Sequence, residues 1–376
     1  MMIPFNRPCV CGRELEYVRH SIDNGHISGD GAYTKRANGM LEALFPGARV
    51  LLTTSCTHAL EMAAILLDLQ PGDEVIVPSF TFVSGVNAFV LRGAKPVFAD
   101  IRRDTLNLDE RQLEALITPR TKAIAPVHYA GVACEMDAIM EIARRHGVAV
   151  VEDNAHGLFA KYRGRPLGTF GALATQSFHE TKNISCGEGG ALVINDVALY
   201  ERAEIIREKG TNRSRFFRGQ VDKYTWVDIG SSYLPSDMLA AYLVGQLEVA
   251  ESIQTSRRRI WERYDRELAE WATHHGVTRP FVPEHCEQPY HMYYILLPSL
   301  ADRTELIAWL RAREILAVFH YLPLNASEMG ERYGARAGDC PVTEDISDRL
   351  LRLPMYNDMR DDEQSRVVDA LLSWRR

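Results

Sequence analysis

Residues 122–152 read KAIAPVHYAGVACEMDAIMEIARRHGVAVVE and contain two short apolar runs separated by an amphipathic stretch. The runs 122–127 and 148–152 have the length and composition of buried strands, and the apolar residues of 136–146 recur with helical spacing. Two strands joined through a helix predict a parallel pair with a right-handed crossover. This stretch therefore indicates an α/β protein.

The same alternation extends from about residue 49 to residue 195. Further strands are predicted at 49–53, 74–77, 96–100, 172–177 and 191–194, and further helices at 58–69, 83–91 and 110–117. The pattern predicts one mostly parallel seven-stranded sheet covered on both faces. A long helix predicted from 236 to beyond 255 leads into charged helices. We therefore expect a large domain with an N-terminal arm, residues 1–250, and a smaller C-terminal α/β domain, residues 251–376.

The composition argues against several classes of protein. Of the 376 residues, 46% are hydrophobic and 25% are charged, as in ordinary globular proteins. The formal net charge of -7 and the lack of a basic run interleaved with aromatics argue against a nucleic-acid partner. The sequence has no signal-peptide pattern and no 18-residue uncharged apolar run, so we expect a cytoplasmic protein with no membrane partner.

The seven cysteines are scattered along the chain, and their odd number does not suggest a disulfide framework. We expect them to be reduced thiols. Cys9 and Cys11 form a C-x-C pair, but no second pair follows at zinc-site spacing. His179 and Glu180 are not part of an H-E-x-x-H motif. We therefore expect no metal.

Ligands of open α/β sheets bind beyond the carboxyl ends of the strands, and three polar turns occupy such positions. The first reads TTSCTHAL over 53–60. The start of a helix can bind an anion there through free N–H groups, with the hydroxyls of Ser55 and Thr57 as further donors. An ordinary helix N-cap is the alternative interpretation.

The other two turns carry an acid and an amine. Residues 150–156 read VVEDNAH, where Asp153 could pair with a buried cation such as a protonated pyridine nitrogen, or cap a helix. Residues 177–183 read SFHETKN and precede the glycine-rich run GEGG at 187–190. An amine in the position of Lys182 can form a Schiff base with an aldehyde, and Ser177 could donate to the phosphate of the same ligand.

These motifs resemble the DegT/StrS-type sugar aminotransferases, which are fold-type I enzymes like aspartate aminotransferase and use pyridoxal 5'-phosphate (PLP) to aminate nucleotide-linked keto-sugars. The resemblance covers nearly the whole chain, from 3–5 to 353–356. It rests on an ordered set of motifs: TSCTHAL (54–60), PSFTF (78–82), ED-x-AH (152–156), SFH-x-x-K (177–182), GEGG (187–190) and HY-x-PL (320–324).

The resemblance implies a role for each residue at a matching position. It implies that Lys182 binds PLP covalently and later moves a proton between substrate and cofactor. Asp153 is then the acid on the pyridine nitrogen, His156 lies near the phenolic oxygen, and Phe82 stacks on the ring, although a core phenylalanine is the alternative for Phe82.

The phosphate and substrate contacts follow from the same resemblance. It implies that Ser55, Cys56, Thr57 and Ser177 hold the cofactor phosphate. His320 and Tyr321 in the HY-x-PL motif are candidates for substrate binding. The chain has GSSYL at 230–234 where many family members have GYNYR, and Asn325 where a histidine is common. These departures affect substrate contacts and not the lysine chemistry.

The charged and aromatic stretch 207–226 is long for a connection between elements. It and the run 127–137 resemble those of bacterial dTDP-4-amino-4,6-dideoxygalactose transaminases, which serve enterobacterial common antigen synthesis. The resemblance implies dTDP-4-keto-6-deoxyglucose as substrate, L-glutamate as amino donor and a homodimer with shared sites. Arg213 and Lys223 could meet the diphosphate, or could simply be solvated.

Three alternatives remain open at this point. The enzyme could aminate another nucleotide keto-sugar, or the C3 position. It could be a dehydratase of the same group, although those enzymes have histidine at the position of Lys182. It could also be a non-catalytic regulator that binds a nucleotide-sugar or PLP, against which the intact Lys182, Asp153 and Ser177 argue.

Overall fold

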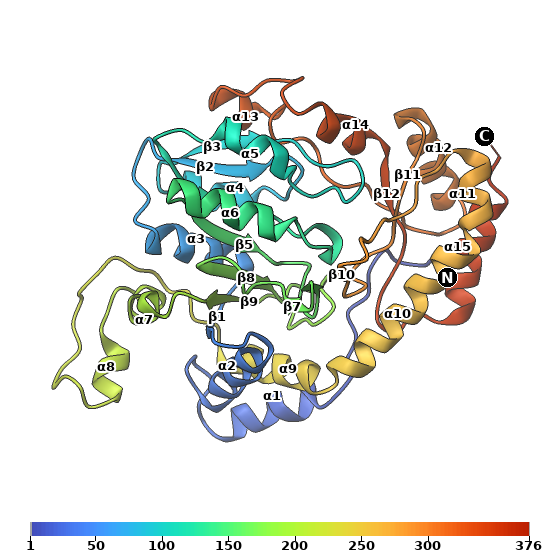
Figure 1. Ribbon diagram of the computed structural model, residues 1–376. Coiled ribbons are helices and arrows are strands. Elements are labelled where there is room, and N and C mark those ends of the chain that lie inside the picture. The colour runs from blue at the N-terminus through green and yellow to red at the C-terminus, as the bar shows by residue number, and fades with distance from the viewer. Residues whose placement is uncertain (1, 376) are drawn as a thin grey trace.

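In the computed structural model, which describes residues 2–375, a central sheet has the strand order β1-β9-β8-β5-β4-β2-β3 (Figure 1). Its strands are Arg49–Thr53 (β1), Glu74–Pro78 (β2), Lys95–Ala99 (β3), Thr121–Ile124 (β4), Ala149–Asp153 (β5), Leu173–Ser177 (β8) and Gly190–Ile194 (β9). The β2–β3, β2–β4, β4–β5 and β5–β8 pairs are parallel, and β9 runs antiparallel to both β1 and β8. The predicted mostly parallel seven-stranded sheet is confirmed.

Helices cover both faces of this sheet. Successive strand residues point to opposite faces, and here the residues on both faces are apolar and need to be covered. Val75 and Val77 belong to one hydrophobic cluster, whereas Ile76 between them belongs to another. The helices of this part are Glu14–Asp23 (α1), Ala32–Leu44 (α2), Cys56–Leu66 (α3), Ser84–Val90 (α4), Leu113–Leu116 (α5), Met136–His146 (α6), Tyr200–Arg207 (α7), Arg213–Phe217 (α8) and Asp237–Glu248 (α9). Short 3₁₀ turns lie at Glu110–Gln112, Tyr129–Gly131 and Val197–Leu199.

The long helix predicted from 236 onward is two helices, because Val249 leaves helical geometry at φ -108°. The later helices are Ala250–Glu267 (α10), Ala269–His275 (α11), Leu300–Arg311 (α12), Glu328–Arg332 (α13), Pro341–Arg349 (α14) and Asp361–Leu372 (α15). Two small sheets complete the structure: β10-β6-β7 and β11-β12, built from Lys161–Tyr162 (β6), Arg165–Pro166 (β7), Cys286–Glu287 (β10), Tyr294–Leu296 (β11) and Leu350–Arg352 (β12). Within residues 2–375, none of the helices has the length and apolarity needed to cross a membrane.

A separate hydrophobic cluster joins α10, α11, α12 and α15 to β11 and β12. Ile3 belongs to this cluster and pairs with Ile315, so the beginning of the chain lies beside its end (Figure 1). We propose that this cluster is the core of a small domain, residues 251–376, and that the arm of the large domain, residues 1–250, reaches across to it.

The edge of the sheet where β1, β5 and β8 end gathers three of the polar turns. Thr53 and Ser177 both pair with Gly190, so the ends of β1 and β8 lie on either side of the start of β9. A Cβ atom at Gly190 would come within 2.4 Å of the Cys56 nitrogen. Only glycine therefore lets the beginning of α3 approach β9 this closely.

The expectation that all the cysteines are reduced is wrong for one pair. Cys9 and Cys11 form a disulfide, with their Cα atoms 5.8 Å apart. This separation is within the usual range for a bridge, which the C-x-C spacing in the arm allows. Cys56, Cys134, Cys186, Cys286 and Cys340 are free thiols.

Candidate active site

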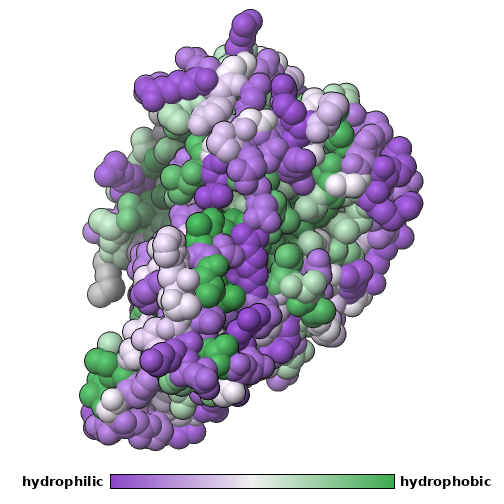
Figure 2. All heavy atoms as spheres, turned by 90° about the vertical axis from the view of Figure 1, so that its left-hand side faces the viewer, coloured by the Kyte–Doolittle hydropathy of each residue, from purple (hydrophilic) through white to green (hydrophobic). Residues whose placement is uncertain are grey.

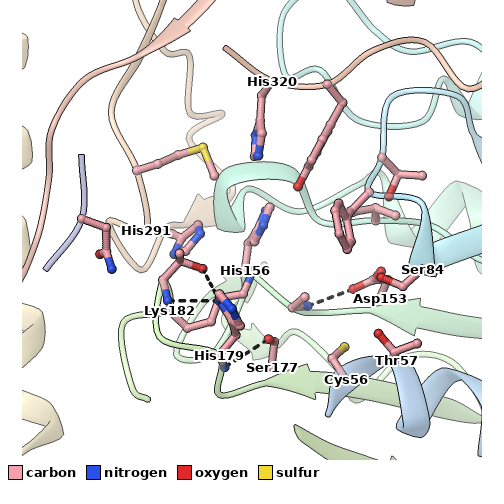
Figure 3. Close-up of a pocket in the computed structure, with 18 of the residues that line it drawn as sticks. Cys56, Thr57, Ser84, Asp153, His156, Ser177, His179, Lys182, His291 and His320 are labelled. Atoms are coloured by element: carbon pink, nitrogen blue, oxygen red, sulfur yellow. Dashed lines mark hydrogen bonds between the residues drawn. The ribbon is translucent and has the colours of Figure 1, made fainter. Parts of the chain in front are cut away.

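A cavity of about 420 Å³ lies at this edge of the sheet, beneath segments that come from beyond residue 290. Lys182 and Asp153 both line it (Figure 3). It therefore joins the two residues on which the proposed chemistry most depends. The predicted site residues along its wall are Ser55, Cys56, Thr57, Phe82, Asp153, His156, Ser177, Lys182, His320 and Tyr321.

Lys182 lies in the turn between β8 and β9, where its main-chain N–H donates to the His179 carbonyl at 2.9 Å. Its ammonium group has no hydrogen bond or ion pair among residues 2–375. Burial lowers the pKa of Lys182 to about 8, against the smaller opposing effects of Cys56 and Asp153. The neutral form, which is the nucleophile, is therefore far more populated near physiological pH than in a solvated lysine, although it is still the minor form.

Asp153 is the last residue of β5 and is buried. Burial raises the pKa of its carboxyl group, while the N–H of Ala155, which donates to Oδ1 at 3.1 Å, and the charge of Lys182 act in the opposite direction. In the described part of the chain no cation pairs with this carboxylate within salt-bridge distance. A ligand with a protonated ring nitrogen would supply the missing partner.

The first turn of α3 forms the predicted anion site. Ser55 is the N-cap of α3, and its hydroxyl oxygen accepts a hydrogen bond from the His58 N–H at 3.1 Å. The oxygen therefore caps the helix, as the alternative interpretation of Ser55 predicted. Its own proton remains available for donation. Cys56 and Thr57 occupy the positions whose N–H groups have no partner within a helix. Burial raises the pKa of Cys56 to about 12, so its thiol carries no charge that would repel a phosphate.

His156 and Phe82 line the cavity, and the groups with which they could contact a ligand, the His156 Nδ1 atom and the Phe82 ring, remain available. His156 Nδ1 is buried and has no hydrogen-bond partner within the described residues. The His156 ring stacks on His291 with centroids 4.4 Å apart, and burial keeps the pKa of His156 well below its ordinary value. Phe82 is 59% exposed, so it is not the core phenylalanine of the alternative interpretation.

Arg213 and Lys223 do not reach the cavity of their own chain. Both are exposed, and α8 with its flanking loop stands away from the sheet (Figure 1). Arg213 lies 3.7 Å from Glu208 and stacks over Phe217. Neither side chain therefore contributes to the wall of the cavity in its own chain.

The sequence interpretation missed several residues of the cavity wall, because they do not follow strands of the large sheet. His291 and Arg352 come from the later part of the chain and Asn6 from the arm, while Ser84 begins α4. Only His291 had a usable sequence signal, since it directly precedes the apolar run 292–297. The described residues contain no group of three or more His, Cys, Asp or Glu side chains placed to bind a metal.

An isolated amine, an unpaired buried carboxylate and a helix N-terminus thus share one cavity at the edge of a doubly covered sheet. Together they define the class of fold-type I PLP enzymes.

The sequence profile of the DegT/DnrJ/EryC1/StrS aminotransferase family matches residues 8–372, and the chain belongs to this family. SpsC, a spore coat polysaccharide biosynthesis protein of Bacillus subtilis, is 31% identical over 377 residues, which cover 98% of this chain and 96% of SpsC. The aminotransferase TlmJ from Streptoalloteichus hindustanus is similar in structure with a TM-score of 0.90 and 30% identity, over 99% of this chain and 98% of TlmJ. The PLP form of Spr1654 from Streptococcus pneumoniae gives a TM-score of 0.91 and 26% identity, over 99% and 98% of the two chains, and that protein also has a PMP form.

Family and site agree that the protein is a PLP-dependent sugar aminotransferase. It takes an amino group from a donor and places it on a sugar.

Proposed function

We propose that the enzyme transfers the amino group of L-glutamate to the 4-keto group of a dTDP-linked 4-keto-6-deoxyhexose. The product would be dTDP-4-amino-4,6-dideoxygalactose, used for a cell-surface polysaccharide such as enterobacterial common antigen. The observation that carries the choice of sugar is the likeness of segments 127–137 and 207–226 to those of transaminases with this product.

The cavity suits PLP by its chemistry. The unpartnered His156 Nδ1, the unpaired Asp153 carboxylate and the exposed ring of Phe82 offer a contact to three different parts of an aromatic cation. When bound, PLP supplies an aldehyde and an electron-withdrawing ring that stabilises negative charge at the carbon that loses its proton. In our proposal Ser55, Cys56, Thr57 and Ser177 hold its phosphate.

The central task of Lys182 is to bind the cofactor covalently and then to carry a proton. The main chain at Lys182 is held in the turn by a hydrogen bond to the His179 carbonyl, which would keep the base of the side chain close to a bound cofactor. With the cofactor bound, the lowered pKa of Lys182 would let its neutral amine take a proton from the substrate carbon and give it to the cofactor, or move it in the opposite direction, within each half of the reaction. The buried carboxylate of Asp153 would hold the ring nitrogen of the cofactor and stabilise a positive charge there.

We propose that the active unit is a homodimer in which α8 and its loop reach the site of the partner. Large apolar side chains are exposed in this segment: Phe216, Phe217, Tyr224 and Trp226. The face on this side of the molecule shows apolar residues among polar ones (Figure 2). Exposed aromatic clusters of this kind mark interaction surfaces. Arg213 and Lys223 would then meet the diphosphate from the second chain.

The deciding experiment is incubation of the holoenzyme with dTDP-4-keto-6-deoxyglucose and L-glutamate, followed by NMR of the sugar product. An axial amine at C4 supports the proposal, with Lys182→Ala as the inactive control. Amination at C3, an equatorial amine, or turnover only with a keto-sugar on another nucleotide would show that the proposed product is wrong. The absence of any aminated product with every keto-sugar tested would favour a non-catalytic role.

A further inference from the structure

Arg352 is the last residue of β12, and its side chain lines the same cavity as Lys182. Its guanidinium carbon lies 4.5 Å from the centre of the Phe5 ring, so the N-terminal arm covers one face of the group. Its charge is close enough to disfavour protonation of Lys182 and His320. The sequence motifs around Lys182 and Asp153 assign no role to this arginine.

The guanidinium of Arg352 has neither a hydrogen bond nor an ion pair anywhere in residues 2–375, and its Nε is shielded from solvent. Arg257 nearby shows the usual arrangement for a buried arginine. Arg257 donates to the Tyr290 carbonyl at 2.9 Å and to Asn357 Oδ1 at 2.8 Å. Arg352 is only partly exposed and its Nε is shielded from solvent, and a charge held there without a partner is costly. The isolation of Arg352 therefore indicates a ligand with a negative charge.

The surrounding side chains provide little negative charge for Arg352. The pKa values of His156, His291 and His320 are lowered by burial, so these rings are neutral. The carboxylates of the cavity wall are Asp153, which the proposed function assigns to the ring nitrogen of the cofactor, and Glu188, which lies 3.7 Å from His179 Nε2. In the described part of the chain neither is within salt-bridge distance of Arg352. Arg352 itself stays protonated, as arginine does in proteins.

Two anions enter this site under the proposed function: the carboxylate of the amino donor and the diphosphate of the sugar nucleotide. In an α-amino acid the α-carboxylate carbon is only about 2.5 Å from the reacting nitrogen. In the sugar nucleotide the hexose ring separates the diphosphate from C4. An arginine in the wall of the lysine cavity suits the first anion, and its planar fork matches a carboxylate.

We propose that Arg352 binds the α-carboxylate of the amino donor. This inference rests on the proposed aminotransfer but not on the identity of the sugar. The keto-sugar has no carboxylate, so Arg352 acts in one half of the reaction and stands aside in the other. The single cavity therefore distinguishes its two substrates partly by whether they engage this arginine.

The test uses the PLP-loaded enzyme with Arg352→Gln, Arg352→Lys and the exposed control Arg311→Gln on α12. The first measurement is calorimetric binding of 2-methyl-L-glutamate, a donor analogue without an α-proton. We expect binding to Arg352→Gln to weaken about 10- to 100-fold, as for loss of a charged hydrogen bond, with partial recovery in Arg352→Lys. The control should bind like the wild type.

The second measurement follows the cofactor spectrum in each half-reaction separately. Conversion by L-glutamate should slow in Arg352→Gln, while conversion by the aminated sugar nucleotide in the reverse direction should change less than about threefold. Equal losses in both halves, or unchanged binding of the analogue, would overturn the proposal. Melting curves and cofactor spectra identify a variant that fails to fold, and Arg352→Lys then provides the decisive comparison. The binding of the donor analogue and the conversion by L-glutamate need no sugar. Both can therefore be interpreted even if the proposed sugar is wrong.

Discussion

Nδ1 of His291 lies 2.8 Å from Oδ1 of Asn183, joining the residue after Lys182 to the later part of the chain. The amide of Asn183 donates to the Pro289 carbonyl at 2.7 Å and to Gln254 Oε1 at 3.0 Å, which fixes its oxygen as the acceptor. Nδ1 of His291 must therefore carry the proton. Since burial lowers the pKa of His291, the ring is neutral and its Nε2 is an acceptor.

The first prediction concerns this link. Asn183→Ala leaves buried polar partners unsatisfied, so the free energy of unfolding should fall by roughly 2–5 kcal/mol in chemical denaturation. Nitrogen NMR should show the Nδ1–H form of His291 in the wild type and a mixture of both neutral forms in the variant. Asn24→Ala, at an exposed position, serves as control. A loss below about 1 kcal/mol would show that the link is dispensable.

The second prediction follows from the pKa of Lys182, which burial lowers to about 8. Only the neutral amine attacks an aldehyde, so covalent uptake of PLP by the apoenzyme should accelerate as pH rises and level off above about 8. The reaction of PLP with Nα-acetyl-lysine, whose side-chain amine is free and solvated, should keep accelerating to higher pH. Rapid-mixing absorbance measures both rates. A protein profile that matches the free analogue contradicts a buried amine.

The third prediction concerns Asp153. Asp153→Asn keeps the shape of the side chain but removes the charge that pairs with the ring nitrogen. We expect PLP affinity to fall about 10- to 100-fold and turnover by on the order of 10²- to 10³-fold. Equilibrium dialysis and steady-state kinetics measure the two effects. Asp137→Asn, on the exposed side of α6, should behave like the wild type. Normal turnover in Asp153→Asn would remove Asp153 from the mechanism.

The fourth prediction tests whether α8 and its loop serve the partner subunit. The double variant Arg213→Ala with Lys223→Ala and the single variant Lys182→Ala should each be weakly active. A mixture refolded or exchanged between the two should recover about a quarter of wild-type activity, because half of the dimers would then contain one intact site. If the loop acts on its own chain, no site is intact and mixing restores nothing.

The sheet and half of the cavity could be predicted because their signals are local. Apolar runs bounded by polar turns located all seven strands, and Asp153 and Ser177 at the strand ends and Lys182 in the turn after β8 were found in this way. The same reasoning fails where distant segments meet. Arg352 and His291 enter the cavity only through the packing of the chain beyond residue 250.

Other differences have equally specific causes. The helix expected to run past residue 255 breaks at Val249, where no glycine or proline announces a stop. Cys9 and Cys11 are joined although the cysteine count suggested free thiols, because a bridge within three residues needs no framework. Arg213 and Lys223 lie outside the cavity, since the charged and aromatic composition of a loop does not tell where the loop packs.

The reversed direction of β9 has a further effect on the reactive lysine. A parallel β9 would require the chain leaving Ser177 to cross a face of the sheet and return to its opposite edge. Instead residues 178–189 form a hairpin over the strand ends, held by the Phe178 N–H on the Gly189 carbonyl at 2.8 Å and the Cys186 N–H on the Phe178 carbonyl at 2.9 Å. The hairpin that carries Lys182 is thereby attached at both of its ends to central strands of the sheet. Insertion of residues into this hairpin should make the position of the Lys182 amine more variable without changing the sheet.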